Sequence, residues 1–338
     1  MKCTNRIART KSRIRRNRIL KQIILCLFLV LIAAAFVFGL TRILNQSVVA
    51  KYETKTYNTT LHEERLFAEE LCVATDDVPY AKFETEDSFY ATSLFSLKDN
   101  TVLLAENMHE KLYPASTTKL LTFYIAVKYG NLDDIVTISE TATILPSGSS
   151  RAWLKVSDKM TLKDLLYSMM LASGNDSAIA IAEYISGTEE AFAERMNEEA
   201  KLLGATNSHF VNSHGYHDDN HYTTAYDLYL IMNACLEDET FLELISTGTY
   251  RTAITEPNGY KRKVEWIQTN HFLNGTYEAP EGIKIIGGKT GSTDEAKSCL
   301  MLYSMDSDSN PYIAIIMGAE NRSKLYNNMS SLLSTIAN

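Results

Sequence analysis

The sequence predicts an α/β domain, one β-sheet flanked by helices, preceded by a single membrane-spanning helix. Three observations support this prediction. An uncharged apolar run, Ile23–Leu40, stands near the N-terminus, and strand-like patterns occur near both ends of the remaining chain. Between those ends, apolar residues recur at helical spacing. Strands on both sides of a helical centre imply one sheet assembled from pieces that are distant in sequence.

The first fifty residues differ in charge from the rest of the chain. They hold ten Lys or Arg and no Asp or Glu, and nine of the ten precede the apolar run. That run reaches the ~18 residues that a helix needs to cross a bilayer. Because Lys and Arg accumulate on the cytoplasmic flank of a span, we expect a cytoplasmic tail at 1–22, a transmembrane anchor in the cell membrane at 23–41, and everything later outside.

Two other interpretations of this segment are a cleaved signal peptide and a basic arm that binds nucleic acid. The run exceeds the usual signal core of ~7–15 residues, and the nearest small-residue site, Val48–Ala50, lies well past its end. The basic residues abut the apolar run and set its orientation, so they need no nucleic-acid partner. An uncleaved anchor is therefore favoured.

Beyond residue 50 the chain is acidic. Of the 33 Lys and Arg, 23 remain there against all 41 Asp and Glu, a formal net charge of −18. This charge argues against a polyanionic partner such as nucleic acid. Residues 42–86 are largely polar and lack regular strand patterning, so we expect an extracytoplasmic stalk there, interrupted by a short helix within Leu61–Val73.

From residue 87 to residue 338 the pattern is that of one compact domain. Its first strands are expected to form a hairpin, Phe89–Leu97 with Val102–Ala105, around a polar turn. The remaining expected elements are helices at Thr161–Leu171, Asp176–Ile185, Thr188–Leu203 and Thr224–Leu236, strands at Ile283–Lys289, Ser298–Tyr303 and Tyr312–Met317, and a closing helix at Lys324–Ala337. Capping boxes are expected at two helix starts, at Thr161 and Thr224.

Three short strings indicate the chemistry of the domain. They are Ser116-Thr117-Thr118-Lys119, Ser173-Gly174-Asn175 and Lys289-Thr290-Gly291. Each is weak alone, because a pattern with two fixed positions in four occurs about once by chance in a chain of this length. Each pattern occurs once here, and the three together in this order form a specific signal.

The first string can supply an activated nucleophile. Pro114 suits a helix start, so Ser116 would lie on the first turn and share a face with Lys119, three residues later. A serine hydroxyl is a weak nucleophile until a neighbouring base takes its proton. Lysine can be that base if burial and a second cation, such as Lys289, lower its pKa.

These strings resemble those of the serine-type D-alanyl-D-alanine carboxypeptidases, the low-molecular-weight penicillin-binding proteins. The resemblance runs from about Tyr90 to the C-terminus and is closest in Leu112–Thr122, Leu171–Ala178 and Gly288–Thr293. It implies a β-lactamase/transpeptidase-like fold, an antiparallel sheet flanked by helices plus a helical subdomain, with the active site between them. It also implies that the partners are a peptidoglycan stem peptide ending in D-Ala-D-Ala and β-lactam antibiotics, with no cofactor and no metal.

The resemblance assigns a role to each matching residue. Ser116 would be acylated, Lys119 would be its general base, and Ser173 would relay a proton to the departing D-alanine. Asn175 would hold a substrate amide, while Lys289 and Thr290 would bind the terminal carboxylate on a strand edge and Gly291 would allow close backbone approach. The oxyanion would lie between the backbone N–H groups of Ser116 and Ser292.

Relatives with other functions share the strings. A class A β-lactamase has a deacylating Glu about thirty-six residues after its second string, and here that region falls near Val211, with no carboxylate. A membrane-anchored β-lactam sensor and a D,D-endopeptidase remain alternatives. The family often has Ala-Gly where this chain has Ala296-Lys297, which leaves peptide preference open.

Two further residue sets allow a prediction. The histidines in the segment from Ser213 to His221 could hold a metal, but a polar turn feeding a capped helix is the favoured interpretation. The three cysteines beyond the anchor cannot all be paired, so buried free thiols are expected at Cys72, Cys235 and Cys299.

Overall fold

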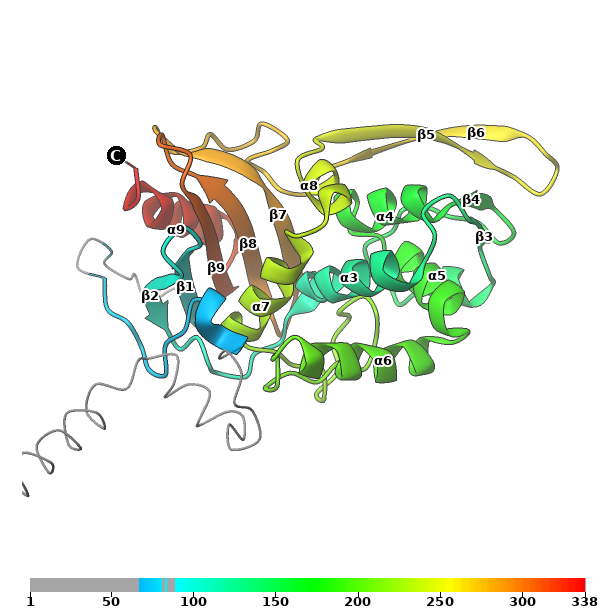
Figure 1. Ribbon diagram of the computed structural model, residues 1–338. Helices are drawn as coiled ribbons and strands as arrows, with labels where there is room; N and C mark the ends of the chain where they lie inside the picture. The colour runs from blue at the N-terminus through cyan, green and yellow to red at the C-terminus, as the bar shows by residue number, and fades with distance from the viewer. Residues whose placement is uncertain (1–66, 81–82, 84–88, 338) are drawn as a thin grey trace, which may run out of the picture. The chain divides into compact units, whose positions relative to one another are not determined.

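The computed structural model describes residues 67–80, 83 and 89–337 (Figure 1). The expected tail at 1–22, the expected anchor at 23–41 and most of the expected stalk lie outside this part of the chain. Among the described helices, none is long and apolar enough to cross a membrane. The chain divides into two compact units, Met1–Ala68 and Glu69–Asn338, and the second unit contains the elements described below except for Phe67 and Ala68.

The main sheet has five antiparallel strands in the order β2-β1-β9-β8-β7. The N-terminal hairpin of β1 and β2 joins the C-terminal meander because β1 pairs with β9. This pairing confirms the α/β fold with an antiparallel sheet assembled from both ends of the domain. The strands are β1 (Ala91–Ser96), β2 (Thr101–Glu106), β7 (Lys284–Thr293), β8 (Lys297–Met305) and β9 (Pro311–Ala319).

Helices pack on the sheet and form the middle of the domain (Figure 1). They are the 3₁₀ turns η2 (Phe67–Glu70), η3 (Ala115–Thr118) and η4 (Thr141–Thr143), and the α-helices α3 (Lys119–Tyr129), α4 (Leu162–Leu171), α5 (Asn175–Ser186), α6 (Glu189–Leu202), α7 (Ala225–Cys235), α8 (Glu239–Ile245) and α9 (Arg322–Ser334). Seven of the eleven residues of α3 are buried, and this helix packs against α5, α6 and α7.

The two faces of the sheet are covered by different helices. Along β9, Ile316 lies in the apolar core that α9 covers, whereas Ile313 points to the opposite face because side chains alternate along a strand. Phe95 pairs with Ile313 and stacks on Tyr229 of α7, with ring centroids 4.1 Å apart. The sheet is therefore buried on both sides, which explains the apolar runs of its central strands.

The helix starts follow the expected capping chemistry. Thr161 and Asp164 form the complete capping box of α4. At α7, Thr224 accepts a hydrogen bond from the Asp227 amide, but the Asp227 carboxylate accepts from the amide of Asn207 and the hydroxyl of Ser208. The second box is thus replaced by a tie between α7 and the loop before it.

A second sheet of four strands was not predicted. It has the order β3-β4-β5-β6 and consists of β3 (Ile135–Thr137), β4 (Lys159–Thr161), β5 (Thr249–Thr255) and β6 (Lys261–Ile267). β3 and β4 have only three residues each, too few to show a period. The β5–β6 hairpin was signalled by its Asn258-Gly259 turn, but polar residues such as Thr252 and Arg262 on its inner face weaken the apolar alternation of a strand.

The compact domain begins earlier than residue 87. The Cys72 amide donates to the Tyr229 hydroxyl at 2.8 Å, and Val78 pairs with Ala105 of β2. The described end of the expected stalk therefore packs on the domain. Cys72 is buried here, as are Cys235 and Cys299, and all three are free thiols, as expected.

Candidate active site

Ser116 lies on the 3₁₀ turn η3, which continues directly into α3. Pro114 precedes the turn, and Ala115 adopts a left-handed conformation with φ of 47°. The turn is held by its own side chains, since Thr117 Oγ1 donates to the Pro114 carbonyl and Thr118 Oγ1 donates to the Ala115 carbonyl. A strained residue in such a fixed turn is typical of functional sites, because the surroundings must supply the energy that the conformation costs.

Lys119 is fully buried beneath Ser116. Its Nζ donates to Ser116 Oγ at 2.9 Å, to Asn175 Oδ1 at 2.8 Å and to the His214 carbonyl at 2.7 Å. The pKa of Lys119 is lowered well below its ordinary value, mainly by burial and secondly by the positive charge of Lys289. A lysine in this environment can take up the hydroxyl proton of Ser116.

The turn between α4 and α5 places Ser173 and Asn175 in the same site. Ser173 has a left-handed conformation with φ of 55° and is buried. A Cβ at Gly174 would lie 2.9 Å from the Ala152 side chain, so only glycine fits between these segments. Asn175 begins α5, and its backbone N–H donates to the Ser150 carbonyl at 2.9 Å.

Strand β7 brings the third string against the nucleophile turn. Lys289 is buried, and its Nζ donates to Ser173 Oγ and to the Thr290 carbonyl, each at 2.9 Å. Burial lowers the pKa of Lys289 to about 7. A Cβ at Gly291 would lie 2.9 Å from the Pro114 carbonyl and 3.0 Å from the Ser116 amide nitrogen. Glycine therefore lets β7 approach the turn that carries the nucleophile.

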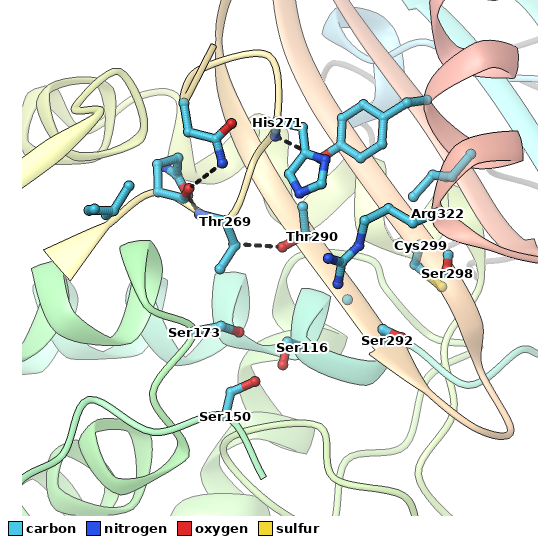
Figure 2. Close-up of a pocket in the computed structure, with 16 residues that line it drawn as sticks. Ser116, Ser150, Ser173, Thr269, His271, Thr290, Ser292, Ser298, Cys299 and Arg322 are labelled. Atoms are coloured by element: carbon cyan, nitrogen blue, oxygen red, sulfur yellow. Dashed lines mark hydrogen bonds between the residues drawn. The ribbon is translucent and has the colours of Figure 1, made fainter. Parts of the chain in front are cut away.

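Two cavities meet at Ser116 and Ser292, and together they form a groove along the edge of β7. One has a volume of about 320 Å³ and is lined by residues that include Thr269, Thr290 and Arg322. The other has a volume of about 410 Å³, shares Ser150 with the first and reaches Asn175. Figure 2 shows the first cavity, with Ser116, Ser150 and Ser173 on one side and the strand bearing Thr290 and Ser292 on the other. The structure thus brings together all eight residues of the predicted site.

Arg322 is a candidate binding residue that the sequence did not reveal. It is the first residue of α9, and Figure 2 shows its side chain reaching toward β7 beside Thr290. No motif surrounds it, and it lies thirty-two positions after Thr290, so only the fold shows that it faces the groove. Its guanidinium can bind a carboxylate through two parallel hydrogen bonds.

The histidines between Ser213 and His221 have separate partners. His221 Nε2 lies 2.9 Å from Thr118 Oγ1 and its Nδ1 accepts from the Val211 amide, while His214 Nδ1 accepts from the Tyr216 amide. Among the described residues, no three His, Cys, Asp or Glu side chains are gathered so that they could hold an ion. This geometry favours the structural interpretation of the segment.

Comparison with known proteins agrees with this geometry. Residues 84–321 match the Peptidase_S11 family, described as D-alanyl-D-alanine carboxypeptidase. The chain belongs to this family. D-alanyl-D-alanine carboxypeptidase DacF of Bacillus subtilis is 35% identical over 223 residues, which cover 64% of this chain and 54% of that protein. DacD of Escherichia coli is 30% identical over 258 residues, 73% of this chain and 62% of that protein.

The fold of this family member also matches solved structures. The crystal structure of the Streptomyces K15 DD-transpeptidase superposes with a TM-score of 0.69 at 26% identity, covering 74% of this chain and 97% of that one. The chain therefore contains nearly the whole of that fold. It spans only a little over half of DacF and less than two thirds of DacD, so those relatives contain regions beyond the matched domain.

Proposed function

We propose that the protein is a serine D-alanyl-D-alanine carboxypeptidase that removes the terminal D-alanine from peptidoglycan stem peptides. The observation that carries this proposal is the buried Lys119 Nζ, 2.9 Å from Ser116 Oγ and beside the second buried cation, Lys289. This pair provides a nucleophile and a base that can be neutral near physiological pH. Family membership and the names of the relatives support the same activity.

The acylation step follows from the positions of these groups. Neutral Lys119 takes the proton from Ser116 Oγ, which attacks the carbonyl carbon of the penultimate D-alanine. The negative charge on the carbonyl oxygen is stabilised by the backbone N–H groups of Ser116 and Ser292, where each donor typically contributes ~3 kcal/mol. As the peptide bond breaks, Ser173 donates its hydroxyl proton to the leaving amine and receives one from Lys289, to which it is hydrogen-bonded. Water then hydrolyses the acyl-enzyme and returns a proton to Ser116 Oγ, while Lys119 loses its extra proton to solvent and Lys289 regains one from solvent.

Substrate binding depends on a local positive charge in an acidic domain. Thr290 and Arg322 line the first cavity and Lys289 is buried beside Thr290, so these three residues would bind the terminal carboxylate. Asn175 would bind a substrate amide on the other side, where the second cavity begins. β-Lactams, which carry a carboxylate beside a reactive amide, would acylate Ser116 in the same orientation.

The test is release of D-alanine from a stem pentapeptide that ends in D-Ala-D-Ala, measured with the full chain purified in detergent. Ser116→Ala should lower release by at least about a thousandfold, because the nucleophile is lost. Ser331→Ala, an exposed serine on α9, is the matched control and should retain wild-type release. Wild-type protein that binds a penicillin covalently but releases no D-alanine would instead support a sensor, and release only from cross-linked peptide would support an endopeptidase.

A second part of the proposal concerns location. Nine basic residues precede the uncharged run Ile23–Leu40, and this supports an anchor in the cell membrane with the catalytic domain outside. Protease added to intact spheroplasts should remove the catalytic domain and leave the N-terminal tail protected. Recovery of the whole chain in the soluble fraction would contradict the anchor.

A further inference from the structure

The loop from Asn212 to Gly215 forms one wall of the pocket around Lys119. Two successive carbonyls of this loop accept hydrogen bonds from one face of α3: Thr122 Oγ1 donates to the Ser213 carbonyl at 2.6 Å, and Lys119 Nζ donates to the His214 carbonyl at 2.7 Å. Lys119 and Thr122 are three residues apart, so they share a helix face. The His214 carbonyl is therefore one of the three groups that accept hydrogen bonds from Lys119 Nζ, and the loop determines where it lies.

The loop is held from its other side by Glu189, the first residue of α6. Glu189 Oε1 accepts from the Ser213 amide at 3.1 Å and from Ser213 Oγ at 2.8 Å. The same oxygen lies 3.4 Å from His214 Nε2. The Glu189 side chain is only 22% exposed, and no sequence motif indicated it.

The ring of His214 has a defined tautomer in this arrangement. Burial lowers the pKa of His214 well below its usual value, so the ring is neutral at physiological pH. Nδ1 accepts from the Tyr216 amide, so the single ring proton must be on Nε2, which faces Glu189. Two hydrogen-bond donors of Ser213 therefore converge on Glu189 Oε1, with the Nε2–H of His214 3.4 Å from the same oxygen, and all three need an acceptor at position 189.

We propose that Glu189 is a positioning residue for acylation: it holds Ser213 and His214 so that the His214 carbonyl stays on Lys119 Nζ, and it places a negative charge near the general base. This inference rests on the proposed function of Lys119. It concerns a residue outside the three strings, on a helix that contributes no group to the groove.

The charge of Glu189 has a predictable sign. A negative charge stabilises protonated Lys119 and so raises its pKa, in opposition to burial and Lys289. Removing the charge should lower the pKa of Lys119 further, and the acidic limb of acylation should move to lower pH. The other charged or titratable groups near Lys119 are Asp176 on α5, Lys289 on β7, and His214 and His221 in the loop. Both histidines are neutral, because burial holds their pKa values low. All four residues are unchanged in the variants.

The experiment measures the acylation rate constant of the full chain with a fluorescent penicillin between about pH 5 and pH 9. Glu189→Gln keeps an acceptor oxygen for Ser213, so its maximal rate should stay within about threefold of wild type, with the acidic limb about 0.5 pH unit lower. Glu189→Ala removes the acceptor and should lower the rate at least tenfold at every pH. Glu190→Gln, the exposed neighbour, is the control with an unshifted profile.

Each result decides the inference. A Glu189→Gln profile that superimposes on wild type, or moves to higher pH, overturns it, and so does a folded Glu189→Ala protein with the wild-type rate. If Glu189→Ala fails to fold by circular dichroism, the shift in Glu189→Gln alone decides, because a purely structural residue would not move the limb. A wild-type protein that is not acylated at all overturns the proposed function and this inference with it.

Discussion

At the scale of single residues, Lys289 makes the proposed activity dependent on pH near neutrality. Its pKa is lowered to about 7 by burial, so the ammonium form dominates below that pH and the neutral amine above it. In the proposed function a terminal carboxylate would bind the ammonium form, and we therefore expect KM for a D-Ala-D-Ala peptide to rise as pH increases above about 7. Steady-state kinetics with the free acid and with its C-terminal amide provide the check, since the amide should lack this dependence. Equal profiles for the two peptides would contradict the assignment.

Lys297 is a second residue whose conformation leads to a prediction. It stands where the family often has glycine, and it has a left-handed conformation with φ of 57° at the β7–β8 turn. A non-glycine residue there costs ~1–2 kcal/mol, which exceeds the entropic cost of glycine in the unfolded chain. Lys297→Gly should stabilise the domain by about 0.5–1 kcal/mol, seen as a higher midpoint in thermal unfolding. Lys284→Gly, at the start of the neighbouring strand β7, should lower that midpoint, and a decrease for both variants would refute the argument.

At the scale of elements, Asp176 joins the start of α5 to the loop that forms a groove wall. Its buried carboxylate accepts from the amides of Ala152 and Leu154, on both sides of Trp153, which has φ of 63°. Asp176→Asn leaves these amides with one oxygen acceptor instead of two. We expect a loss of about 1–3 kcal/mol of stability and faster hydrogen exchange at residues 147–154, measured by mass spectrometry. Asp133→Asn, at an exposed site, should change neither, and unchanged exchange in Asp176→Asn would show that the loop is held by other contacts.

The elements also show where sequence reasoning succeeds. The strong signals were local, such as the Thr161 cap and the apolar run of β9, and both are found where they were expected. The β5–β6 hairpin was missed because its inner face carries polar residues such as Thr252 and Arg262, which weaken the apolar alternation, although its Asn258-Gly259 turn was visible. The sequence could not show that Arg322 lines the groove or that Glu189 binds the loop from Asn212 to Gly215. Both roles arise only from packing between segments that are distant in the chain.

At the scale of the whole molecule, the candidate site lies where three regions meet, and the three sequence strings and their order predicted these regions. The turn η3, the α4–α5 turn and β7 each supply one string, and Gly291 and Gly215 allow them to come close. A Cβ at Gly215 would lie 1.8 Å from the Ala115 carbonyl oxygen, so the loop after α6 also packs directly on the nucleophile turn. The motifs predicted which residues gather there. The glycine contacts that allow the three regions to approach each other could be recognised only in the structure.

The same assembly predicts the fate of a bound β-lactam. A class A β-lactamase deacylates rapidly because a carboxylate activates water beside the acyl-serine, but among the described residues that line the two cavities the only carboxylates are Asp294 and Glu295, at the β7–β8 turn. Val211, where a class A β-lactamase would place its glutamate, instead uses its amide to bond His221. We therefore expect the penicilloyl-enzyme to persist for minutes or longer, observed as a stable mass increase of the intact protein that is absent in Ser116→Ala. Continuous penicillin hydrolysis without accumulation of the adduct would show that water reaches the ester by another route, and Asp294→Asn with Glu295→Gln would then test whether the turn supplies it.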